Sequence, residues 1–278
     1  MSSVKGSPAE PFDRVARRQR RARAAPGFAA HAFLKRAVTA DIAERVAAFG
    51  RVFECGLDLG CHDARVDTGA GWTVALDPAL AFARAAGIPA VVADEDRLPF
   101  GDGSFDIIVS ALALHGVNDL PGALIQARRA LRPGGVFIAA LFGAASLSDV
   151  RAELLAAEDE ATGRAAARVS PMVDVQAAAG LLQRAGFAMP VADVATLTVH
   201  YRDAARALAD LHGMAEGNIL ATREPLRRAV LADAVRRFEA RRAPDGRIAV
   251  AIDIVTLTGF APSGLPDAAL GEAMRARV

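Results

Sequence analysis

The fold of this chain is decided by residues 91–142, which read VVADEDRLPFGDGSFDIIVSALALHGVNDLPGALIQARRALRPGGVFIAALF. Three short apolar runs, rich in β-branched side chains, predict buried strands at 91–92, 105–109 and 136–142. Residues 120–131 repeat apolar side chains at helical spacing, and Pro133-Gly134-Gly135 predicts the end of that helix and a turn. Strands that alternate with helices predict a parallel sheet whose ligands bind at the carboxyl ends of the strands.

The same patterns continue on both sides of this segment. Further strands are predicted at 52–59, 72–76, 191–201 and 248–260. Helices are predicted at 33–49, 80–86, 149–162 and 174–185, and residues 202–242 are mostly helical in pattern. Ser148 is the predicted N-cap of the helix at 149–162. The chain is therefore predicted to be an α/β protein.

The composition indicates the number of domains, the kinds of partner and the location to expect for this protein. The chain has 278 residues, 53% of them apolar, which is enough for one large α/β domain or two small ones. A formal net charge of +1 argues against nucleic acid as a partner. Two cysteines are too few for a disulfide framework, and no apolar run approaches the roughly 20 residues that span a bilayer. The N-terminus also lacks the apolar core of a secretory signal. We therefore expect a cytoplasmic protein without membrane insertion.

The N-terminal segment is rich in arginine between Arg14 and Arg23. Such a start is typical of a mitochondrial transit peptide, although the acidic residues Glu10 and Asp13 lie within it. A solvated helical face explains the arginines equally well. The functional alternatives are an arm that docks a partner and a lid over a cofactor.

Three motifs carry a family resemblance: D-x-x-x-L-P-F-x-x-x-S-F-D from Asp94, H-x-x-N-D-L from His115, and R-R-x-L-x-P-G-G from Arg128. They resemble the class I S-adenosylmethionine-dependent methyltransferase superfamily. The longer strings SPMVDVQAAAGLLQRAGFAMPVADVATLTVHY and DLHGMAEGN resemble its complex I assembly factor group, which is related to the malonyl-carrier-protein methyltransferases of biotin synthesis. The resemblance extends from about residue 12 to residue 262.

The resemblance implies a Rossmann-like fold, with a mostly parallel seven-stranded sheet, a reversed last hairpin and a helical C-terminal cap insertion. We expect five segments along the chain: a disordered tail at 1–11, a basic helical arm at 12–50, a cofactor-binding core at 51–147, the C-terminal part of the fold at 148–262 with its cap at about 203–242, and a tail at 263–278.

The loop after the first predicted strand departs from the family pattern. It reads Asp58-Leu59-Gly60-Cys61-His62-Asp63-Ala64, so the first glycine of D-x-G-x-G-x-G is present, while His62 and Ala64 replace the other two. A β-carbon at His62 would fill space that the cofactor uses, and a positive φ would be strained there. The segment up to Asp77 is also short, and Gly69 and Gly71 predict a stunted or irregular first helix.

The resemblance implies S-adenosylmethionine as the cofactor. Its expected contacts are Asp58, Gly60, Cys61, His62, Asp77, Pro78, Asp94, Glu95 and Leu98. Asp77, at the end of a strand, suits a ribose diol, and Asp94 or Glu95 would face the adenine amino group. Three of these residues have a structural alternative: Asp77 as a helix N-cap, Asp94 as a surface carboxylate, and Leu98 as a core residue.

His115, Asn118 and Asp119 follow the strand that the family uses to face its substrate. His115 is the candidate catalytic residue, as a general base or a ligand of a polar substrate atom. The alternative is that Asn118 or Asp119 caps the next helix while His115 packs in the loop. Residues 211–218 are polar and punctuated by glycine within a helical region, which indicates a substrate or partner contact or a plain turn between helices.

Two function hypotheses follow. The first is an enzyme that modifies a protein substrate, which the resemblance identifies as a complex I subunit, by methylation or by arginine hydroxylation; a carrier-protein or small-molecule O-methyltransferase is a variant of this hypothesis. The second is a non-catalytic assembly chaperone whose altered glycine loop no longer holds the cofactor.

Overall fold

The computed structural model describes residues 10–63 and 66–263. Seven strands form one sheet in the order β3-β2-β1-β4-β5-β7-β6. The strands are β1 (Phe53–Leu59), β2 (Ala70–Asp77), β3 (Ala90–Val92), β4 (Phe105–Ala111), β5 (Leu131–Phe142), β6 (Ala188–Tyr201) and β7 (Ile248–Phe260). The first five in sequence are parallel, while β7 runs antiparallel to both β5 and β6. The predicted mostly parallel sheet with a reversed last hairpin is therefore confirmed.

Helices cover both faces of the sheet. Successive residues of a strand point to opposite faces, so these apolar strands present side chains that need covering on both sides. Ile107 of β4 packs with α2 (Phe33–Ala48) in one buried cluster. Its neighbour Ile108 packs with α4 (Leu120–Ala130) and α6 (Val175–Arg184) in another. The fully apolar strands predicted from the sequence are thus buried on both faces.

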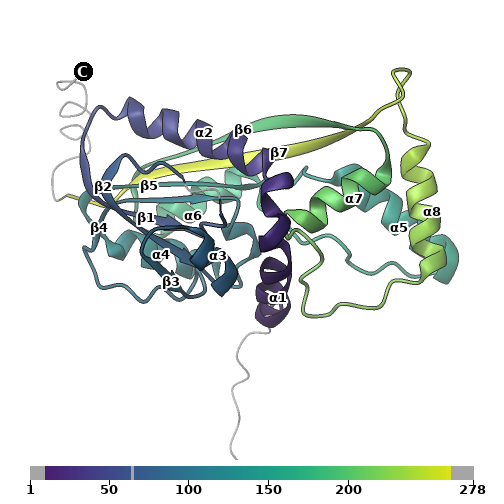
Figure 1. Ribbon diagram of the computed structural model, residues 1–278, viewed down its shortest axis with the longest axis horizontal. Coiled ribbons are helices and arrows are strands. Elements are labelled where there is room, and N and C mark those ends of the chain that lie inside the picture. Colours follow the sequence, from purple (N-terminus) through teal and green to yellow (C-terminus); the bar gives the residue numbers. More distant parts are fainter. Residues whose placement is uncertain (1–9, 64–65, 264–278) are drawn as a thin grey trace, which may run out of the picture.

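A separate helical layer stands at one end of the long β6–β7 hairpin, where Figure 1 shows α5 (Ser148–Thr162), α7 (Ala204–Gly213) and α8 (Arg228–Glu239) together. The predicted helical region at 202–242 is interrupted between α7 and α8, at 214–227. We call α5, α7, α8 and this interruption the cap. The predicted tails at 1–11 and 263–278 lie almost wholly outside the described residues.

The N-terminal arm folds as α1 (Arg14–Ala24) followed by the 3-10 helix η1 (Ala25–Ala30). Asp13 caps α1, since its side chain accepts a hydrogen bond from the backbone N–H of Ala16. Figure 1 shows α1 standing between the sheet and the cap. Two short elements complete the fold: α3 (Leu80–Ala85) after β2, and the 3-10 turn η2 (Leu114–Gly116) after β4.

Some local predictions were wrong. The helix before Pro133-Gly134-Gly135 ends at Ala130, as predicted, but these residues lie within the bounds of β5 rather than in a turn between elements. The pairing with β4 is irregular there, passing from Leu131 to Val136, and Gly134 adopts φ +74°, which glycine tolerates. Ser148 does not cap α5, because Leu147 occupies the N-cap position in a left-handed conformation. The described residues between β1 and β2 form no helix, which extends the predicted irregularity of that segment.

The central strands set the stability of the fold. Phe137 of β5 is fully buried, so Phe137→Ala is expected to lower the free energy of unfolding by about 3–5 kcal/mol. Val52→Ala is the matched control, because Val52 is 90% exposed and its truncation should change stability by less than about 0.5 kcal/mol. Urea unfolding followed by circular dichroism measures both; equal effects would contradict this burial pattern.

Candidate functional site

The carboxyl ends of β2 and β3 gather buried carboxylates. Asp77 is the last residue of β2, and Asp94, Glu95 and Asp96 follow β3. Asp77 and Glu95 have no exposed surface, and Asp96 has 6%. Buried carboxylates are costly unless they are paired, so their partners determine what this site can do.

Arginines from one face of α1 supply those partners. Arg14, Arg17 and Arg21 lie three and four positions apart, which places them on the same side of the helix. Arg17 donates to Glu95 through both terminal nitrogens, at 2.5 and 2.8 Å. Arg14 binds Asp96 in the same way at 2.6 and 2.8 Å. The expectation of a solvated arginine face is wrong for this side of α1.

Asp77 is the most fully engaged of these carboxylates. Arg21 donates to both its oxygens, with an Nε–Oδ1 distance of 3.2 Å. The backbone N–H groups of His62 and Ala79 donate to Oδ2 and Oδ1 at 3.1 and 2.8 Å. The predicted role of Asp77 as the N-cap of α3 is wrong, because Ala79 occupies the N-cap position and no side chain caps the helix; Asp77 binds the N–H of Ala79 just before it. No oxygen of Asp77 is left without a donor.

His62 fills the space beside the loop. Its ring stacks on Phe28 of η1 with centroids 5.0 Å apart and lies 5.1 Å from the ring of Phe82. Its Nδ1 is 3.0 Å from the carbonyl oxygen of Gly60, and its Nε2 is 2.7 Å from Arg21 Nη1. An arginine can only donate, so Nε2 is the acceptor and Nδ1 carries the proton. The residue adopts φ +51°, as expected from its glycine-replacing position.

Burial holds the pKa of His62 well below its ordinary value of 6.5, and the positive charges of Arg21 and Lys35 lower it further. The ring is therefore neutral at physiological pH. Lys35 of α2 is itself fully buried and donates to the carbonyl oxygens of Ala111 and Gly60, at 2.5 and 3.3 Å. Burial, the largest influence, lowers the pKa of Lys35.

Gly60 is the one glycine of the family loop that the chain keeps, and the packing requires it. It adopts φ +77°, and a β-carbon there would lie 2.1 Å from the β-carbon of Ala113. Around it, Asp58 is fully buried and its Oδ2 accepts from the N–H of Val66 at 3.2 Å. Cys61 is also fully buried, and burial raises the pKa of its thiol, so this thiol is not a reactive group.

The remaining predicted cofactor contacts lie around this cluster. Asp94 pairs with Arg14 and Arg18, each at 3.3 Å. Pro78 is buried, and Leu98 packs against the core beneath α4 while its N–H donates to Gln126. The residue types thus match those that a nucleoside cofactor needs. Their arrangement does not, because α1 and His62 already occupy the acceptors of Asp77 and Glu95.

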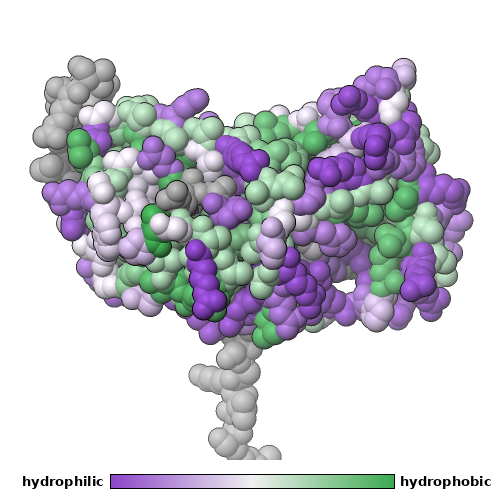
Figure 2. Space-filling model, in the orientation of Figure 1, coloured by the Kyte–Doolittle hydropathy of each residue, from purple (hydrophilic) through white to green (hydrophobic). Residues whose placement is uncertain are grey.

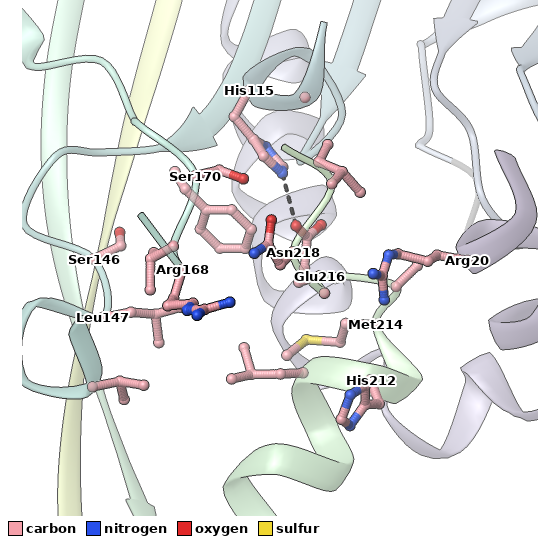
Figure 3. Close-up of a pocket in the computed structure, with 18 of the residues that line it drawn as sticks. Arg20, His115, Ser146, Leu147, Arg168, Ser170, His212, Met214, Glu216 and Asn218 are labelled. Atoms are coloured by element: carbon pink, nitrogen blue, oxygen red, sulfur yellow. Dashed lines mark hydrogen bonds and ion pairs between the residues drawn. The ribbon is translucent and has the colours of Figure 1, made fainter. Parts of the chain in front are cut away.

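A cavity of about 400 Å³ lies next to this cluster, between α1, the end of β5 and the cap. We call it the first cavity. Its walls are largely apolar, and they include Leu112, Phe142, Leu147 and Met214. Figure 3 shows its polar groups converging from the sheet side and from the cap. Figure 2 shows the surface hollowed between α1 and the cap helices, with hydrophilic side chains around it.

His115 and Glu216 meet in the first cavity. His115 Nε2 lies 3.0 Å from Glu216 Oε2, and the His115 ring packs 4.6 Å from that of Phe142. Burial opposes ionisation of Glu216, but the interaction with His115 and the charges of Arg21 and Arg17 outweigh it and lower the pKa of this carboxyl. The cavity therefore presents an ionised carboxylate held by a histidine.

In the loop after β4, Asp119 and Asn118 make structural contacts, whereas His115 lines the first cavity. The Asp119 side chain accepts from the N–H of Gly122 at 2.8 Å, which confirms its role as the cap of α4. Asn118 instead binds the backbone of Phe12 at 2.8 and 3.1 Å, which fastens the arm to the sheet. His115 lines the first cavity, and its catalytic role stays a prediction. Nothing in the sequence identified Glu216 as its partner.

Sequence reasoning also missed the α1 arginines and Lys35 as members of the site. The spacing of Arg14, Arg17 and Arg21 was the available signal, because a one-sided arginine row at i, i+3 and i+7 indicates a helix face with a common partner. The glycine-punctuated segment at 211–218 was the signal for Glu216.

Comparison with known proteins agrees with this architecture. Residues 57–139 match the family model of a methyltransferase domain. The chain is 36% identical over 263 residues to the mouse (Mus musculus) protein named arginine-hydroxylase NDUFAF5, mitochondrial, covering 90% of this chain and 77% of the relative. It is 33% identical over 189 residues to a malonyl-[acyl-carrier protein] O-methyltransferase of Laribacter hongkongensis, covering 66% of this chain and 60% of that relative.

A solved structure supports the fold alone. The YcgJ protein of Bacillus is 13% identical and superposes with a TM-score of 0.58, covering 82% of this chain and 99% of its own. Among the described residues, no helix is both long and apolar enough to cross a bilayer.

The buried neutral His62 makes stability depend on pH. Below pH 6.5 the unfolded chain binds a proton that the folded chain excludes, so the free energy of unfolding is expected to fall as the pH falls, by up to about 1.4 kcal/mol per unit. His62→Gln should reduce this slope between pH 6.5 and 5, and His200→Gln, on an exposed position of β6, should not. Urea unfolding across this pH range checks it, and identical slopes in both variants would contradict a neutral buried imidazole.

Proposed function

Because this chain belongs to the S-adenosylmethionine-dependent methyltransferase superfamily, in the group of the NDUFAF5 arginine hydroxylases, we propose that it hydroxylates an arginine of a protein substrate during assembly of respiratory complex I. The observation that carries the proposal is the identity of 34–36% with these relatives over 83–90% of the chain. Methylation of the same substrate is the outcome that the superfamily offers instead. The cytoplasmic location expected from the sequence stays a prediction.

The first cavity suits an arginine side chain. An aliphatic stem packs against apolar walls such as Phe142 and Met214, and a guanidinium pairs with an ionised carboxylate, here Glu216. Most arginines that line the cavity are already neutralised: Arg17 by Glu95, Arg21 by Asp77, Arg168 by Glu158 and Arg223 by Asp13. Glu216 therefore offers its charge to an entering cation.

S-adenosylmethionine is the proposed cofactor, with Asp77 for the ribose and Glu95 or Asp94 for the adenine. Since α1 occupies these carboxylates, the proposal requires Arg21 and Arg17 to withdraw when the cofactor binds. The cofactor can displace α1 only if it binds more tightly to the form of the protein in which the helix has withdrawn. Part of its binding free energy is then used to break the arginine–carboxylate pairs, so its measured affinity should be lower than without them.

A non-catalytic assembly protein is the second candidate. The observation that favours it is the complete satisfaction of Asp77 by Arg21, His62 and Ala79, which leaves no acceptor for a ribose hydroxyl. In this candidate α1 never withdraws, and the cap serves as a docking surface for the client.

Calorimetric titration with S-adenosylmethionine separates the two candidates. We expect micromolar binding to the wild type and none to Asp77→Ala, since that variant lacks the ribose acceptor. Arg21→Gln, which removes the competing guanidinium, should bind more tightly than the wild type, whereas Arg18→Gln, in the half-exposed pair with Asp94, should change binding little. If neither the wild type nor Arg21→Gln binds the cofactor at millimolar concentration, the non-catalytic assembly protein is the candidate that remains.

The reaction is tested by the intact mass of a complex I subunit incubated with the protein, the cofactor, air and a chemical reductant that supplies the two electrons needed to reduce the second oxygen atom of O2 to water. We expect a gain of one oxygen atom, located on an arginine by fragmentation. Glu216→Gln should reduce the yield by at least about tenfold, because a charge-assisted pair is worth roughly 1.5–3 kcal/mol.

Glu160→Gln is the matched control, because Glu160 is 72% exposed on α5 and lies away from the first cavity. It should leave the yield unchanged. A gain of one methyl group would assign the protein as a methyltransferase instead. An unmodified subunit, with cofactor binding intact, would contradict this choice of substrate.

A further inference from the structure

A second cavity, of about 460 Å³, lies between α1, η1 and α7. It adjoins the first cavity, because Arg20, His212, Ala215 and Gly217 line both. None of the residues predicted to hold the cofactor lines the second cavity. It is therefore a separate feature of the molecule, which the proposed reaction does not use.

The charge of the second cavity is one-sided. Arg20, Arg23, His31 and His212 line it, and no acidic residue of the described chain does. His31 has a partner, since its Nδ1 lies 2.7 Å from the buried carboxylate of Asp210. The side chains of Arg20, Arg23 and His212 have no hydrogen bond or ion pair with any described residue.

Arg20 is the least satisfied of these groups. Its side chain is half-buried, and its Nε is completely buried without an acceptor, although its neighbours Arg17 and Arg21 on α1 each bind a carboxylate. Burial lowers the pKa of Arg20, and the charges of Arg223 and Arg23 lower it further. A guanidinium held among other cations with an unmet donor is complementary to an anion.

The backbone makes room for these cations. A β-carbon at Gly213 would lie 2.2 Å from the His31 ring, and one at Gly217 would lie 2.7 Å from Arg20 Nη1. The two glycines of the segment at 211–218 thus allow His31 and Arg20 to lie against the chain after α7. Figure 3 shows Arg20 and His212 approaching from the side of the first cavity opposite Arg168.

We propose that the second cavity is a binding site for an oxyanion, a phosphate or carboxylate group, held by Arg20 and Arg23 with His212 beside them. The ligand would accept hydrogen bonds from the terminal nitrogens of Arg20 and would offset the repulsion between Arg20 and Arg23. Because the site adjoins the first cavity, a bound molecule that extends from one to the other places its anionic group at Arg20.

The test is calorimetric titration of the full chain with inorganic phosphate at constant ionic strength, without cofactor or protein substrate. A glutamate-containing tripeptide is titrated in parallel. Arg20→Gln is expected to lower the affinity for the bound probe about tenfold, the effect of losing one charge-assisted contact. Arg18→Gln removes a charge from the opposite side of α1 and should leave the affinity unchanged.

Gly217→Ala gives a second, independent variant. The new methyl group would displace only the flexible end of Arg20, so the chain should fold while the guanidinium is moved and its charge kept. We expect the same loss of affinity as in Arg20→Gln. Binding of phosphate alone assigns a phosphate site, and binding of the peptide alone assigns a carboxylate site. No binding of either probe at millimolar concentration, or equal binding by wild type and Arg20→Gln, would overturn the proposal. Neither outcome depends on whether the protein hydroxylates arginine.

Discussion

The pairing of α1 arginines with carboxylates at the strand ends is the interaction on which the arrangement of this site depends. Removing one partner from a buried pair of this kind costs about 3–5 kcal/mol, whereas the half-exposed pair of Arg18 with Asp94 contributes about 1 kcal/mol or less. The buried pairs of Arg17 and Arg21 therefore hold the helix over the sheet. Anything that binds Asp77 or Glu95 must compete with them, which couples the N-terminal arm to occupancy of the site.

The arm and the cap are parts of one structure. Phe12 pairs with Leu220 of the segment between α7 and α8, and Asp13 pairs with Arg223 of the same segment. That segment also carries Glu216, the partner of His115. A displacement of α1 would therefore change the walls of both cavities, because residues of α1 line both of them. The physical link is a set of direct contacts between α1, the cap and the loop after β4, without any intermediate element.

The proposed arginine pocket presents a negative charge to its ligand, whereas the proposed oxyanion site presents a positive charge. The difference arises because the arginines that line the two cavities have different partners. In the first cavity the lining arginines are mostly neutralised by carboxylates, so Glu216 determines the charge presented to a guest. In the second, Arg20 and Arg23 have no such partners, so the charge stays positive. Two neighbouring sites of opposite preference suit a substrate that carries both a cation and an anion, such as a protein segment.

Strand periodicity in the sequence predicted the strands and the edge at which Asp77 and Glu95 gather, because this periodicity is local and parallel strands end together. The reversed hairpin was implied by the family resemblance. It also marked His62 as a residue in a glycine position. It could not assign the partners of Arg17 and Arg21, which lie 78 and 56 positions away along the chain, or bring Glu216 to His115 across 101 residues. Helical spacing states which side chains share a face, but what that face meets depends on how the arm and cap pack on the sheet. Only the tertiary structure decided that the predicted cofactor carboxylates are held by the protein's own arginines.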